Sequence, residues 1–230
     1  MSRWDQLNDF CQLEDDCHLI FGINALFGRS NSTCGDEVNC LVDSVDNSCC
    51  TAWSGEWNSE QAEELLRYTF SRNHSIYAFE FGNELVGPGG IESHLEAELY
   101  ADDLCKLKSL IEDVWGDAAD KPKIISPDNG FNAEWYQTFI EATFEKGCAP
   151  DVVTWHQYIL GAGVDEAAET KSMDPEYLDQ QKQAGKNVLT TVQDATPEGV
   201  SQPEIWMGEA GGAYNSGRPG TTDSFHSSFW

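Results

Sequence analysis

Five short apolar, β-rich runs most constrain how this chain can fold. They lie at residues 19–23, 76–81, 123–126, 152–158 and 205–207. Each run is continuous rather than alternating in polarity, which indicates strands buried on both faces, as in a parallel sheet. The segments between the runs carry helical periodicity. The repeated order of strand and helix therefore predicts right-handed βα units.

The predicted helices carry recognisable start signals. Residues 93–96 (Ser-His-Leu-Glu) have the pattern of a capping box, which predicts a helix that begins there and runs through Trp115. Asp174 followed by Pro175 predicts an N-cap with proline at the first helical position. These signals place helices in the gaps between the apolar runs.

A doubly wound sheet and a (β/α)8 barrel both satisfy this order of elements. Polar residues gather where the predicted strands end, which favours the barrel, because barrel enzymes bind and react at the carboxyl ends of their strands. These residues are Asn24, Asn83, Glu84, Asp128, His156, Tyr158 and Glu209. No Gly-x-Gly-x-x-Gly sequence follows a strand, which argues against a dinucleotide site. No composition break divides residues 1–230, so we predict one domain.

Charge narrows the choice of partner. The chain has 40 acidic against 13 basic residues and a formal net charge of -27. Such a surface repels nucleic acids and anionic membranes, and it makes a heavily sulfated glycan a poor ligand. No apolar stretch of about 18 residues is present, so we expect no transmembrane segment, although peripheral membrane association stays open.

The cysteines indicate an oxidising compartment. Four of the eight cysteines, at positions 34, 40, 49 and 50, crowd the polar segment 29–58, which we expect to be a long loop held by disulfides. The spacing does not give two Cys-x2-Cys pairs, so we expect no zinc site, no other metal and no cofactor. We expect a secreted, extracellular, cell-wall or lysosome-like location.

Two glutamates are the strongest candidates for chemistry. Glu84 and Glu209 each end an apolar run within a tight context of glycine and asparagine. A buried carboxylate is costly unless a partner neutralises it or a reaction uses it. Glycoside hydrolysis is the reaction that most needs two such groups. The alternatives are a strand-end Glu84 paired with a lysine or arginine, and an incidental Glu209 in a glycine-rich turn.

Three motifs resemble glycoside hydrolase family 79, the heparanase-like β-glucuronidases. They are residues 81–85 (Phe-Gly-Asn-Glu-Leu), 151–161 (with Trp-His-Gln-Tyr) and 206–217 (Trp-Met-Gly-Glu-Ala-Gly-Gly-Ala-Tyr-Asn-Ser-Gly). Residues 21–26 and 225–230 are similar to the same family. The likeness follows the family's order along almost the whole chain, except in the cysteine-rich segment.

The resemblance implies a retaining, double-displacement mechanism on a barrel. Glu84 corresponds to the acid/base and Glu209 to the nucleophile, while Asn83 corresponds to the residue that contacts the sugar 2-hydroxyl. The strand-end residues Asn24, Asp128, His156 and Tyr158 are further candidates for substrate binding, and Tyr214, Asn215 and Ser216 match the turn that recognises a uronate carboxylate. The family often has Gly-Gly after that tyrosine, and the different residues here weaken the inference of uronate recognition.

The predicted fold is α/β, a partial (β/α)8 TIM barrel of approximately strands 3 to 7. Strands 1, 2 and 8 and the family's C-terminal β-sandwich have no counterpart in this sequence, so we expect an incomplete catalytic domain. The predicted function is a retaining glycoside hydrolase that cleaves β-linked glucuronic acid, or a related sugar, in extracellular glycans. The alternatives are another clan A β-glycosidase and a non-catalytic carbohydrate-binding remnant.

Overall fold

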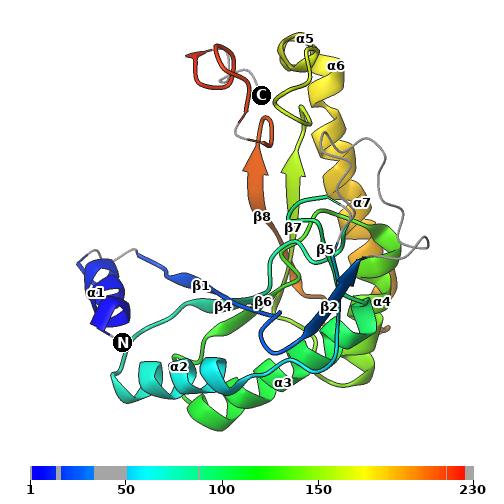
Figure 1. The fold of residues 1–230 in the computed structure, drawn as a ribbon. Helices are drawn as coiled ribbons and strands as arrows, with labels where there is room; N and C mark the ends of the chain where they lie inside the picture. The colour runs from blue at the N-terminus through cyan, green and yellow to red at the C-terminus, as the bar shows by residue number, and fades with distance from the viewer. Residues whose placement is uncertain (1, 14–16, 34–50, 88, 216, 226–230) are drawn as a thin grey trace.

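A computed structural model describes residues 2–13, 17–33, 51–87, 89–215 and 217–225 (Figure 1). Its centre is a five-stranded parallel sheet in the order β1-β4-β6-β7-β8. The strands are β1 (Ile20–Ile23), β4 (Ala78–Phe81), β6 (Lys123–Ser126), β7 (Val152–Tyr158) and β8 (Glu204–Gly211). Each predicted run thus forms one strand, and each strand lies beside the preceding one. A doubly wound sheet would reverse its direction, so this order is that of a barrel arc.

Helices connect the strands. They are α1 (Ser2–Cys11), α2 (Glu60–Ser71), α3 (Ala97–Trp115), α4 (Ala133–Glu145), α5 (Ala168–Ser172), α6 (Pro175–Leu178) and α7 (Gln180–Ala195). Figure 1 shows α2, α3, α4 and α7 along one side of the bent sheet, as the helices of a barrel surround its strands. The described residues form an α/β arc and not a closed barrel, which confirms the predicted fold class.

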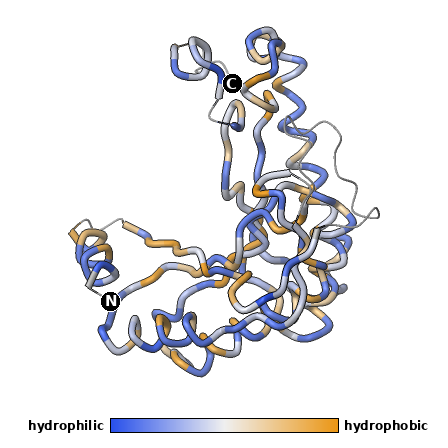
Figure 2. Tube along the Cα trace, viewed as in Figure 1, coloured by the Kyte–Doolittle hydropathy of each residue, from blue (hydrophilic) through white to orange (hydrophobic). Residues whose placement is uncertain are grey.

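The main core lies between the sheet and these helices. Phe79 and Phe81 of β4 are fully buried against Leu104, Leu107 and Phe139 of α3 and α4. Figure 2 shows the hydrophobic residues of β1 and the more polar course of β8. Burial on both faces was predicted for every strand, and this is wrong for β1 and β8, which carry several exposed residues. These two strands are the edges of the arc and have a neighbour on one side only.

A second sheet joins β2 (Ser30–Thr33), β3 (Thr51–Ser54) and β5 (Ser93–His94). It corrects the predicted long loop at 29–58, whose two ends are antiparallel strands. It also corrects the capping-box prediction, because Ser93 and His94 pair with β3 and the helix α3 begins only at Ala97. Pairing with a distant strand outweighs the local capping pattern here. The predicted cap at Asp174 is confirmed, since its side chain accepts a hydrogen bond from the Glu176 amide.

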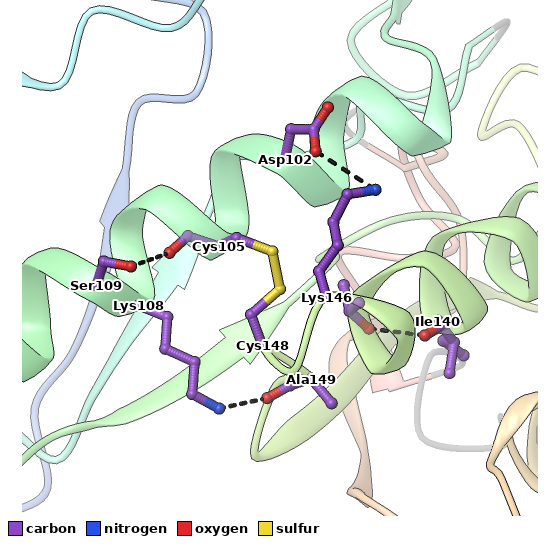
Figure 3. Close-up of a disulfide and its surroundings, with 9 residues drawn as sticks. Asp102, Cys105, Lys108, Ser109, Ile140, Lys146, Cys148 and Ala149 are labelled. Atoms are coloured by element: carbon purple, nitrogen blue, oxygen red, sulfur yellow. Dashed lines mark hydrogen bonds and ion pairs between the residues drawn. A yellow bond between two sulfur atoms is a disulfide. The ribbon is translucent and has the colours of Figure 1, made fainter.

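Two disulfides link described cysteines, as predicted. Cys11 pairs with Cys17, and Cys105 of α3 pairs with Cys148, which follows α4 (Figure 3). Lys108 Nζ donates to the Ala149 carbonyl at 2.8 Å beside the second bridge. Cysteines 34, 40, 49 and 50 lie outside the described residues. Within the described ranges, no helix combines the length and apolar character that crossing a bilayer requires.

Candidate active site

Glu84 lies in a tight turn directly after β4. Its backbone has φ +51°, an unusual conformation for a residue with a side chain, and the turn is fixed by the loop that follows β6. The Glu84 amide donates to the Asp128 carbonyl at 2.8 Å, and the Leu85 amide donates to the Asn129 side chain. Gly90 packs on the Glu84 carboxylate so closely that a Cβ there would lie 2.2 Å from Oε2. The loop after β6 therefore fixes the backbone of Glu84, and Gly90 limits the space around its carboxylate.

Glu209 reaches the same place from β8. The β7/β8 register runs evenly to the pair Trp155 and Met207, then shifts so that His156 lies opposite Glu209. This irregularity has the effect of a β-bulge, which reorients the side chains beyond it. The Tyr158 hydroxyl donates a hydrogen bond to Glu209 Oε1. That bond, and then burial, raises the pKa of Tyr158 to about 12, so the phenol remains a donor.

His156 bridges the two glutamates. Its Nδ1 lies 3.0 Å from Glu84 Oε1 and 3.6 Å from Glu209 Oε2, while Nε2 lies 2.5 Å from Asp128 Oδ1. Burial alone would lower the pKa of His156. The hydrogen bonds to Asp128 and Glu84 and the surrounding negative charges outweigh burial and raise this pKa to about 10. His156 is therefore an imidazolium at neutral pH, and its charge offsets the carboxylates around it.

The two glutamates face one open cleft of about 740 Å³. One oxygen of Glu84 and one oxygen of Glu209 lie within 4.8 Å of each other. The Glu84 side chain is 18% exposed and that of Glu209 is 43% exposed, so both can reach a ligand. The rest of the lining is mostly polar or small: Gly89, Gly90, Glu92, Gly130, His156, Gln157, Tyr158, Ala213, Tyr214, Asn215 and Gly217.

Glu84, His156 and Glu209 have the spacing of a metal site, but their chemistry does not fit one. A histidine ligand must offer a neutral nitrogen with a free lone pair. Both His156 nitrogens face carboxylates, and the raised pKa keeps both of them protonated. The three groups instead form an ion cluster that is held by proton-donating nitrogens.

The structure brings most of the predicted site residues together. Glu84, His156, Tyr158, Glu209, Tyr214 and Asn215 line the cleft. Asp128 lies behind His156 and contacts it, while Asn24 and Asn83 line a separate hollow of about 280 Å³. The Asn24 side chain accepts a hydrogen bond from the Leu26 amide, which gives it a role in its own turn. Ser216 lies outside the described residues.

Two important residues were missed by the sequence reasoning. Glu80 lies within β4, and Thr154 of β7 donates a hydrogen bond to it at 3.2 Å. Burial, followed by the charge of Asp128, raises the pKa of Glu80 to about 7. The available signal was a glutamate inside the apolar run Ala-Phe-Glu-Phe, four residues before Glu84. The prediction considered polar residues at strand ends, and Glu80 lies inside its strand, so it was not included.

An arc of parallel βα units with two carboxylates that face one cleft is the arrangement typical of glycoside hydrolases of the barrel class. The chain belongs to glycosyl hydrolase family 79, because residues 1–230 match the family's N-terminal domain. It is 35% identical to heparanase-like protein 2 of Arabidopsis thaliana over 230 residues, which are 100% of this chain and 38% of that protein.

Two further curated relatives are similar to the chain. A baicalin-beta-D-glucuronidase of Scutellaria baicalensis is 32% identical over 231 residues, which are 100% of this chain and 41% of the relative. Heparanase of Rattus norvegicus is 27% identical over 181 residues, which are 75% of this chain and 31% of that protein. The chain thus spans well under half the length of these relatives.

Solved structures give the same fold. A glycoside hydrolase family 44 endoglucanase from Clostridium acetobutylium aligns with 91% of this chain and 53% of its own, with a TM-score of 0.55 and 10% identity. At that identity the likeness concerns the fold alone.

Proposed function

We propose that the protein carrying this chain is a retaining glycoside hydrolase that cleaves β-linked glucuronic acid or a related sugar. The observation that carries the proposal is the approach of the Glu84 and Glu209 carboxylates, within 4.8 Å across one cleft. Retaining glycosidases hold their two carboxyl groups about 5–5.5 Å apart, whereas inverting enzymes need roughly 6.5–9.5 Å to admit a water. The short separation therefore favours double displacement.

In the first step, a Glu209 carboxylate oxygen attacks the anomeric carbon while the bond to the glycosidic oxygen breaks. That oxygen keeps the electron pair and takes the proton from the Glu84 carboxyl, so the leaving alcohol departs neutral. In the second step, the Glu84 carboxylate takes a proton from water. The water oxygen bonds to the anomeric carbon, and Glu209 is released as a carboxylate. The Tyr158 and His156 donors keep the Glu209 and Glu84 oxygens in place.

The choice of sugar rests on a relative and on the turn at the cleft rim. A relative bears the name baicalin-beta-D-glucuronidase, and Tyr214 and Asn215 line the cleft where a sugar substituent would lie. A second candidate is a β-glycosidase for neutral sugars. It is favoured by the cleft lining, which among the described residues contains Glu84, Glu92 and Glu209 but no lysine or arginine. The one cation among the described lining residues is His156, and both of its ring nitrogens already face carboxylates of the protein.

We also propose that the substrate is an extracellular glycan and that the protein works in a secreted, cell-wall or lysosome-like compartment. The Cys11–Cys17 and Cys105–Cys148 bridges support this, because disulfides persist in oxidising compartments.

The test is covalent trapping with a 2-fluoro-β-glucuronosyl fluoride and with its glucosyl counterpart. The protein should gain the mass of one sugar, mapped to the peptide that contains Glu209, and the better of the two reagents should identify the sugar. Glu209→Gln should prevent labelling, while Glu198→Gln, which alters an exposed glutamate after α7, should not. Binding without a mass shift would replace the hydrolase with a carbohydrate-binding protein. A product of inverted anomeric configuration would exclude double displacement.

A further inference from the structure

Asn129 is a fully buried polar residue that the proposed mechanism does not use. It lies in the loop after β6, next to the cleft residue Gly130. Its Oδ1 accepts a hydrogen bond from the Leu85 amide, whereas its Nδ2 has no hydrogen-bond partner among the described residues. A buried donor without a partner is unfavourable, so the oxygen and not the nitrogen explains why this side chain is buried here.

The orientation of the Asn129 amide follows from the group that faces it. The Leu85 backbone N–H is a donor, so the side-chain atom opposite it must be the acceptor oxygen. The reversed amide would place two donors against each other and leave both of them unpaired. The Asn129 side chain therefore restrains the backbone directly after Glu84.

The loop that contains Asn129 joins the Glu84 turn to β7. On one side, the Asp128 carbonyl accepts from the Glu84 amide at 2.8 Å, and Asn129 Oδ1 accepts from the next amide, that of Leu85. On the other side, the Asn129 carbonyl accepts from the His156 amide at 2.8 Å. One loop thus fixes the backbones of Glu84 and His156, whose side chains are joined by the 3.0 Å contact of Oε1 with Nδ1.

Tyr136 of α4 anchors this loop. Its buried hydroxyl lies 2.9 Å from the carbonyl of Asn129 and 2.9 Å from that of Thr154. A phenol has one proton, which is shared between these two acceptors. The Thr154 hydroxyl in turn accepts from the Asp128 amide at 2.9 Å. The loop is therefore tied to both α4 and β7, and Asn129 acts from a fixed position.

Glu84 needs a restraint because its backbone is strained. Its φ of +51° lies in the left-handed region, which residues with a Cβ seldom adopt. Such a conformation persists only where the surrounding structure over-determines it. Hydrogen bonds from the consecutive amides of Glu84 and Leu85 do so here, and the second of them ends on the Asn129 side chain. Removal of that oxygen should let the turn relax and the Glu84 carboxyl move.

We propose that Asn129 is a positioning residue for the acid/base. Its side-chain oxygen holds the Glu84 turn in the conformation from which the carboxyl can protonate the leaving group. Asn129 is fully buried, so it acts through Glu84 and not on the sugar. This role deepens the proposed function and rests on it. Loss of Asn129 should impair the steps in which Glu84 transfers a proton and spare the attack by Glu209.

The experiment measures how hydrolysis of aryl β-glucuronides and β-glucosides depends on the leaving phenol. A dinitrophenolate departs without a proton, whereas an unsubstituted phenolate needs one from Glu84. In Asn129→Ala, kcat/KM should fall about 100-fold for the phenyl glycoside and change by less than about threefold for the dinitrophenyl glycoside. Azide attacks the glycosyl-enzyme without help from a general base, so it should restore kcat on the dinitrophenyl glycoside.

Asn132→Ala is the matched control. Asn132 lies in the same connection, and its side chain also accepts a hydrogen bond from a backbone amide, that of Trp135 at 3.1 Å. This bond caps α4, so its loss should lower stability and leave the dependence on the leaving phenol as in the wild type. An equal loss on both substrates in Asn129→Ala, or the same selective loss in Asn132→Ala, would overturn the proposal.

Amide hydrogen exchange adds a measurement that needs no substrate. The Leu85 amide should be protected in the wild-type protein and should exchange about tenfold faster in Asn129→Ala, as expected for the loss of one hydrogen bond. If Asn129→Ala fails to fold, the wild-type exchange decides, and an unprotected Leu85 amide would refute the contact. A wild-type protein that hydrolyses no glycoside would refute the hydrolase, whereas an active protein with an unprotected Leu85 amide would refute only the role of Asn129.

Discussion

Replacing Gly90 with alanine should disable the proposed acid/base without touching its side chain. A Cβ at position 90 would lie 2.2 Å from Glu84 Oε2 and 2.6 Å from its carboxyl carbon. Such separations are well inside van der Waals contact, so either the carboxylate or the loop must shift by about 1 Å. A misplacement of that size can cost about 100-fold in rate. We therefore expect kcat on an aryl β-glycoside to fall about 100-fold in Gly90→Ala.

Gly147→Ala is the matched control. Gly147 follows α4 with φ +71°, close to the φ of +56° at Gly90, and a Cβ there meets nothing within 4 Å. Both variants should lose roughly 1 kcal/mol of stability from the left-handed backbone. Only Gly90→Ala should lose activity. A Gly90→Ala protein with wild-type kcat would refute the contact between Gly90 and Glu84, and an equal loss in Gly147→Ala would assign the defect to backbone strain.

Three further predictions follow from the described contacts. The Cys105–Cys148 disulfide closes a loop with a sequence separation of 43, so replacing both cysteines with serine should lower the free energy of unfolding by about 4 kcal/mol. An unchanged denaturant midpoint would contradict this prediction. Tyr158→Phe removes the donor to Glu209 and should reduce kcat about ten- to hundred-fold, the equivalent of about 1.5–3 kcal/mol, with a melting temperature near that of the wild type. Glu80 has a raised pKa, so its stability contribution is full below about pH 4.5 and lost as the pH rises through about 7. Denaturant titrations should show a pH-dependent loss of at most about 3 kcal/mol, reduced by partial solvent contact, that Glu80→Gln removes.

The sequence predicted the β strands because their signal is local. Each of the five apolar runs became a strand of the parallel sheet, since burying such a run next to a helix is the main way to remove it from water. The prediction failed where a distant partner decided the outcome. Ser93 and His94 have a helix-capping pattern but pair with β3, more than 35 residues away, and that contact has no local signature.

Some residues of the candidate site could likewise be predicted from local sequence, and others could not. Strand ends marked Glu84, His156 and Glu209, because polar residues after apolar runs are visible in the sequence, and the fold brought them to one cleft. Asn24 and Asn83 met the same criterion and lie in another hollow. Glu80 lies inside its strand and did not meet that criterion. Its hydrogen-bond partner Thr154 lies 74 residues away in the chain, so the contact has no local signal in the sequence.

The sequence by itself determined the order of strands and helices and the identity of the two candidate catalytic glutamates, because periodicity and residue type act over a few positions. Only the tertiary structure decided how close those glutamates come, which charge His156 carries and why the pKa of Glu80 is raised. These properties depend on distances and burial between residues from different strands. The β7/β8 register shift that turns Glu209 toward His156 is of the same kind, since a register exists only between two strands.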